Sequence, residues 1–188
     1  MTKISIGFSR PKKTKFLSSL IMLIEGTNYS HVFVTWTCPY IKKRKVFEAV
    51  GSGVRIVSNH IFKEQAEVIE LYDFYVSEEK LIYIEQKVHA MLGRPYSFKA
   101  LFGLAFMRLC NWFNRVFKVA GIQHNPYKDG RYSQICVEAG GVVLEELVFK
   151  PVEYEDFGLI DFNNLTRLLA FNKADQERLD RINGKNNS

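Results

Sequence analysis

Segments with strand character fill the first half of this chain and segments with helical character fill most of the second. Runs rich in β-branched and aromatic residues predict strands at Lys3–Phe8, His31–Thr37, Lys45–Val50, Val54–Val57 and Ala66–Tyr72. Apolar residues at helical spacing predict helices at Thr14–Glu25, Ser77–Met91, Ser97–Val119, Ile135–Val148 and Asp161–Phe171. Because parallel sheets need alternating strands and helices, we expect the α+β class, with an antiparallel sheet packed against helices.

The length of 188 residues predicts one domain with room for a sizeable core. We expect this domain to span residues 1–172 and residues 173–188 to form a tail, because "NGKNNS" at the end offers nothing to bury. The three cysteines are odd in number and widely spaced, which predicts neither a disulfide framework nor a CxxC metal site. His60, His89 and His124 also lack metal-ligand spacing, although His124 lies close enough before Cys136 to enter a site there.

The net charge of +6 is mildly basic, and much of it comes from "PKKTK" at 11–15 and "KKRK" at 42–45. Solvated turns explain both clusters, and contact with an anionic membrane or wall surface is the alternative. No nucleic-acid motif accompanies them, so we expect no specific nucleic-acid partner. The N-terminus "MTKISIGFSR" lacks the apolar run of a signal peptide, which predicts a cytoplasmic protein. Inclusion in a phage particle or delivery to the cell wall stays open.

The segment from Ser97 to Val119 is strongly apolar and aromatic. Its large apolar residues recur at three- and four-residue steps, which predicts a helix: Phe102, Phe106, Leu109, Phe113 and Val116. Basic and amide residues interrupt the segment, so it does not have the apolar run of a membrane span. We expect a helix of the core. The alternative is an interfacial helix, aromatic on one side and basic on the other, that rests on a bilayer.

Two residues stand out as candidates for nucleophilic chemistry. His31 opens an otherwise apolar strand, "HVFVTW", and Cys136 lies in the first turn of the helix predicted at 135–148. The positive end of a helix stabilises a thiolate, and its free N–H groups can hold an oxyanion. The alternatives are a packed histidine and a small apolar filler. A filler role is what we expect for Cys38 and Cys110.

Glu48 interrupts the next apolar strand much as His31 interrupts its own. If the connecting turn is the four residues 38–41, Thr37 pairs with Lys42 and His31 lies directly opposite Glu48. Opposed residues share one face of a sheet, with Cβ atoms about 5 Å apart. The carboxylate would then hold one ring nitrogen of His31 and leave the other for a thiol, as in enzymes with a nucleophile, a base and an orienting group.

Four segments in this order resemble the landmarks of the circularly permuted NlpC-type papain-like superfamily, which includes the YiiX-like proteins and, more distantly, lecithin–retinol acyltransferase-like enzymes. They are "YSHVFV", "VFEAVGSGVRI", "LGRPYS" and "YSQICVEAGGVVLEEL". In the permuted group the histidine precedes the cysteine, as it does here. The resemblance covers roughly Ile4 to Leu169 and implies a permuted papain-like fold.

The resemblance also implies roles for single residues. His31 and Glu48 match the histidine and acid of the sheet, Cys136 and Glu138 match the "CSE"-like helix start, and Tyr96 matches a turn before the middle helices. Val137 departs from the usual serine, and "AGG" at 139–141 loosens the helix. The function implied is a cysteine peptidase or amidase that acts on peptide or cell-wall murein, as in bacterial and phage members, without metal or organic cofactor.

Two alternatives remain. A thiol acyltransferase or lipid hydrolase at a membrane surface would use the aromatic helix, with an acyl chain as substrate. A non-catalytic binding or virion-associated module on the same fold would explain the loosened cysteine helix.

Overall fold

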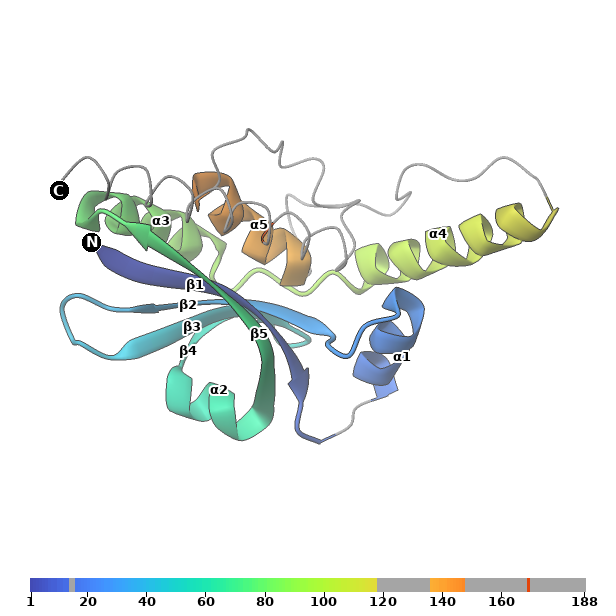
Figure 1. Ribbon diagram of the computed structural model, residues 1–188, viewed down its shortest axis with the longest axis horizontal. Coiled ribbons are helices and arrows are strands. Elements are labelled where there is room, and N and C mark those ends of the chain that lie inside the picture. The colour runs from blue at the N-terminus through green and yellow to red at the C-terminus, as the bar shows by residue number, and fades with distance from the viewer. Residues whose placement is uncertain (14–15, 118–135, 148–168, 170–188) are drawn as a thin grey trace, which may run out of the picture.

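The computed structural model describes residues 1–13, 16–117, 136–147 and 169. Five antiparallel strands form one sheet in the order β4-β3-β2-β1-β5 (Figure 1). The strands are β1 (Thr2–Pro11), β2 (His31–Thr37), β3 (Arg44–Val50), β4 (Gly53–Ser58) and β5 (Ala66–Val76). The expected α+β class with an antiparallel sheet is therefore confirmed, and β1 and β5 are longer than the sequence pattern predicts.

The helices lie around this sheet. They are α1 (Phe16–Glu25), α2 (Asn59–Gln65), α3 (Glu78–Met91), α4 (Phe98–Phe117) and α5 (Cys136–Leu147). Figure 1 shows α3 and α5 on one face of the sheet and α2 on the other, while α1 and α4 lie at one end. The helix predicted at Asp161–Phe171 and the tail at 173–188 fall outside the described residues, apart from Leu169, which is buried.

The main core lies between the sheet and the helices α3 and α5. Alternate residues of the central strands face it, among them Phe8, Val34 and Trp36, and all three are buried. Leu81, Ile84 and Val88 of α3 and Val143 and Leu144 of α5 cover them. Glu146 of α5 also pairs with Lys80 and Lys87 of α3, which ties the two helices together. This packing fixes the position of α5, whose first residue is Cys136.

One helix is missed by the sequence pattern, and the surroundings of another differ from those expected. The helix α2 was not predicted, because only Phe62 within it is buried and a single anchor gives no helical repeat. The helix α4 exists, but it is not a core helix along the predicted stripe, since Phe102, Phe106, Leu109 and Phe113 are all exposed. Within the described part of the chain, every helix is too short or too polar to cross a membrane.

Candidate active site

The structure brings His31 and Glu48 together, but through a different register from the predicted one. Thr37 pairs with Arg44 rather than Lys42, because the β2–β3 loop is two residues longer than expected. Phe33 therefore lies directly opposite Glu48, and His31 is the diagonal neighbour of Glu48. Since side chains alternate with a period of two, the shift keeps both side chains on one face. The Nε2 atom of His31 lies 2.9 Å from Oε2 of Glu48.

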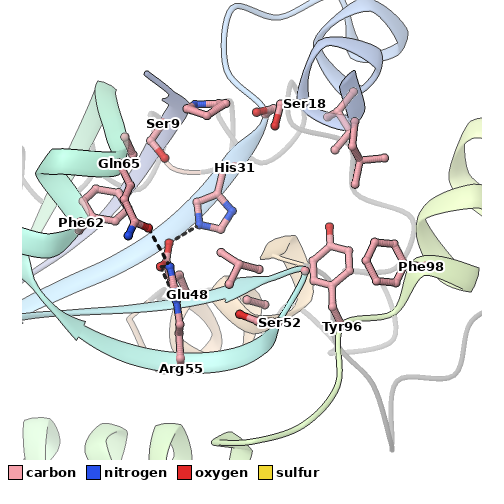
Figure 2. Close-up of a pocket in the computed structure, with 18 residues that line it drawn as sticks. Ser9, Ser18, His31, Glu48, Ser52, Arg55, Phe62, Gln65, Tyr96 and Phe98 are labelled. Carbon is pink, nitrogen blue, oxygen red and sulfur yellow. Dashed lines mark hydrogen bonds and ion pairs between the residues drawn. The ribbon is translucent and has the colours of Figure 1, made fainter. Parts of the chain in front are cut away.

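Arg55 is a third member of this cluster, and the sequence reasoning missed it. It lies on β4 directly opposite Glu48. Its Nε and Nη2 atoms donate hydrogen bonds of 2.9 and 2.7 Å to Oε1 of Glu48. The two carboxylate oxygens thus have separate partners, one for His31 and one for Arg55 (Figure 2). The two-residue turn at Gly51 and Ser52 fixes the β3–β4 register, so the pairing could have been found.

Glu48 is buried, with only 4% of its surface exposed, yet it is held as an anion. Burial alone would raise its pKa. The hydrogen bonds and charges of His31 and Arg55 oppose burial and lower the pKa of Glu48 below its ordinary value. A buried carboxylate with two cationic partners is a stable acceptor for the imidazole N–H. It therefore fixes which ring nitrogen of His31 faces away.

Cys136 is the first residue of α5, and it is 5% exposed. A close approach of α5 to β2 positions it, because a Cβ atom on Gly140 would lie only 2.8 Å from Cγ1 of Val32. Gly140 is thus a packing requirement, and the "AGG" segment forms regular helix. The first turn of α5 also contains Glu138, which is buried.

His31 links Cys136 to Glu48. Burial disfavours the charged imidazolium, but hydrogen bonds to Cys136 and Glu48, together with the charges of both groups, raise the pKa of His31 to about 10. Because Glu48 holds Nε2, Nδ1 is the nitrogen that remains for Cys136. The arrangement places Cys136, His31, Glu48 and Arg55 in a row, in which each group contacts the next.

A cavity of about 430 Å³ lies beside this row. Its wall includes His31, Glu48 and Arg55, residues of α1, and Tyr96 and Phe98 at the start of α4. Figure 2 shows His31 next to Glu48, with Ser18 of α1 above His31 and with Tyr96 and Phe98 on the other side of the cavity. Cys136 is not among the described lining residues, so His31 is the residue that contacts both the thiol and the cavity.

Tyr96 lies next to the same site. Burial, followed by the negative charges of Cys136 and Glu138, raises the pKa of Tyr96 well above its ordinary value. Its ring packs edge-on against Phe98, with ring centroids 5.0 Å apart. The phenol therefore stays protonated at neutral pH, and its hydroxyl in Figure 2 points toward the cavity. It is a hydrogen-bond donor for a bound carbonyl or anion.

Neither metals nor known families add to this description. Among the described residues, no three His, Cys, Asp or Glu side chains gather as metal ligands would. His60 and His89 lie on α2 and α3, away from the row, and His124 falls outside the described residues. No protein-family model matches the chain, and no curated protein or solved structure shows a significant match to it.

Proposed function

We propose that this chain is a permuted papain-like thiol enzyme in which Cys136 attacks a carbonyl carbon, His31 transfers protons and Glu48 orients His31. The observation that carries the proposal is the position of His31, which hydrogen-bonds Cys136 on one side and Glu48 on the other at the wall of a cavity. A nucleophile, a base and an orienting carboxylate in this sequence of contacts are the groups that acyl transfer needs.

The charges support a thiolate–imidazolium pair as the resting state. Imidazolium is the form of His31 that its neighbours favour, because Glu48 is ionised and Arg55 holds it so. Cys136 is the first residue of α5, and the dipole of a helix gives its N-terminal end a positive potential. A proton on His31 and a negative sulfur are thus compatible with every neighbour in the row.

The reaction then proceeds in two halves. The sulfur of Cys136 forms a bond to the carbonyl carbon, and the oxygen takes up the electron pair beside the backbone N–H of Cys136. His31 donates its proton to the leaving nitrogen as the carbon–nitrogen bond breaks, which leaves a thioester. Water attacks the thioester, and His31 accepts the water proton. The carbon–sulfur bond then breaks, which releases the carboxylic acid and restores the thiolate.

The bond is an amide of a peptide or of murein, as the family resemblance implies. A cavity of about 430 Å³ has the size of sites that bind a small molecule or one segment of a polymer. Tyr96 and Arg55 are among the polar residues that line this cavity beside His31. The packing of Gly140 against Val32 weakens the case for the binding-module alternative, because it gives one of the two glycines in the cysteine helix a structural reason.

The test is the pH dependence of alkylation at each cysteine, measured by mass spectrometry with iodoacetamide. A free thiol titrates near pH ~8.5. We expect Cys136 to react well below that pH, and His31→Ala to abolish this reactivity. Cys110, which is partly exposed, serves as the internal control in the same sample.

The rate of amide hydrolysis provides a second test. Cys136→Ala and His31→Ala should lower amide hydrolysis by at least about a thousandfold, while the circular dichroism spectrum stays unchanged. Glu48→Gln should cost less, because the amide oxygen can still accept from His31. Equal tolerance of all three substitutions, or ordinary reactivity of Cys136, would rule the triad out.

A further inference from the structure

Large apolar side chains are exposed on the two helices that border the cavity. On α1, Phe16 is 85% and Leu23 is 80% exposed, and their seven-residue spacing puts them on one helical face. On α4, Phe102 is 60% and Phe106 is 48% exposed, and Leu109 continues the same stripe. We call these five residues the apolar rim.

The apolar rim continues into the cavity. Phe98, which lines the cavity, stands one helical turn before Phe102 on the same face of α4. Leu17 and Ile21 of α1 line the cavity from their inner face, while Phe16 and Leu23 point to the outer one. The helix α4 extends beyond the sheet (Figure 1), which presents its stripe at the end of the molecule that holds the cavity.

The charge of these segments identifies the partner. Residues 12–25 and 94–117 together hold seven lysines or arginines and one acidic residue. Lys12, Lys13 and Lys99 are exposed. Two copies of a surface with these three exposed lysines would repel each other, whereas an anionic bilayer attracts it. Exposed aromatic residues beside basic ones suit the headgroup region of a bilayer, and a purely polar wall polymer would not need them.

We infer that α1 and α4 bind the surface of an anionic lipid bilayer through the apolar rim and the lysines beside it. The bound protein would have the mouth of its cavity at the level of the headgroups. This inference concerns docking only, and it holds whether or not Cys136 is a nucleophile. If the proposed chemistry is also correct, the enzyme meets its substrate at the membrane.

The experiment is flotation of the full chain with vesicles made of equal parts of phosphatidylcholine and phosphatidylserine. Pure phosphatidylcholine vesicles give the charge-free comparison. We expect binding to the mixed vesicles that weakens as salt is added. Each of Phe102→Ser and Phe106→Ser should weaken partitioning on the order of tenfold, because each removes a large half-exposed apolar surface. Lys99→Glu should weaken it by about fivefold or more.

Matched controls come from the β2–β3 loop, which lies at the opposite end of the molecule (Figure 1). Tyr40 and Ile41 are also exposed there, and Lys43 is an exposed lysine beside them. Tyr40→Ser, Ile41→Ser and Lys43→Glu should leave vesicle binding unchanged, and so should Cys136→Ala. Since Cys136→Ala removes the chemistry and keeps the rim, failure of the proposed reaction and failure of docking are distinguishable.

Three outcomes would overturn the inference. The folded wild-type chain could fail to float with the mixed vesicles. Substitutions in the loop could weaken binding as much as those in the apolar rim. Sedimentation could show a dimer that Phe102→Ser dissociates, which would make a second copy of the chain the occupant of the rim.

Discussion

Replacing Arg55 by methionine tests whether the buried carboxylate depends on its second cation. The variant removes both hydrogen bonds to Oε1 of Glu48 and keeps much of the apolar stem of Arg55. Breaking a buried ion pair costs about 3–5 kcal/mol. The Arg55 side chain is 35% exposed, so water can replace part of what is lost. We therefore expect the free energy of unfolding to fall by about 2 kcal/mol, which lowers the Tm by about 4–8 °C.

Arg10 supplies a matched control. Its Nε atom lies 2.8 Å from Glu67, a distance like those at Arg55, but both partners are about half exposed. Arg10→Met should lower the free energy of unfolding much less than Arg55→Met, because solvent screens this exposed pair. Urea unfolding of the two variants and the wild type at neutral pH measures both values. Equal losses for Arg55→Met and Arg10→Met would refute the argument, because they would show that burial of Glu48 does not strengthen its pairing.

The acid side of the stability curve gives an independent check. The pKa of Glu48 in the folded chain is below its ordinary value of 4.5. Its contribution to stability is therefore present above that value and is lost as the pH falls through the folded pKa. Arg55→Met removes one cause of the lowered pKa, so in the variant this loss should be smaller and should be complete at a higher pH. If the free energy of unfolding depended on acid pH in the same way in the variant and the wild type, the assigned role of Arg55 would be contradicted.

Two further predictions concern His31 and the seat of α5. The pKa of His31 is raised from 6.5 to about 10, so its stabilising contribution is present below 6.5 and is lost as the pH rises through 10. In the thiolate–imidazolium pair, this loss shows only above the ordinary thiol pKa of about 8.5, where the folded chain holds one proton more than the unfolded chain. There the unfolding free energy of the wild type should fall more steeply with pH than that of His31→Asn, and parallel curves would contradict the raised pKa. Gly140→Ala should cost about 1–3 kcal/mol in urea unfolding, because its Cβ would meet Val32 at 2.8 Å. Gly51→Ala should leave the free energy of unfolding nearly unchanged, since its Cβ would lie 3.5 Å from the Phe98 ring. Equal losses for Gly140→Ala and Gly51→Ala would contradict the tight packing of α5 on β2.

Local signals located the elements that carry them. The bounds of β2 match the prediction, because "HVFVTWT" is a continuous run of strand formers. The start of α3 also matches, since the side chain of Ser77 caps it and two glutamates follow. In contrast, α2 has one buried residue, which gives no helical repeat in the sequence. The exposure of α4 depends on tertiary packing, because α3 and α5 already cover one face of the sheet. Sequence periodicity identifies the apolar face of a helix, but it does not identify what covers that face.

The register of β2 and β3 shows why an error of two residues preserved the contact but changed its physics. Direct opposition would have paired His31 and Glu48 at the open end of the sheet. Instead Phe33 lies opposite Glu48 and packs with Val46 and Phe62 in a small apolar cluster. A Cβ atom on Gly7 would lie 2.4 Å from the Phe33 ring, so this glycine makes room for it. Glu48 lies beside this cluster and is 4% exposed, and a buried carboxylate is costly unless cations and hydrogen bonds compensate its charge. The need for Arg55 thus follows from the position of Phe33, and a one-residue shift would have turned Glu48 into the core beneath α5.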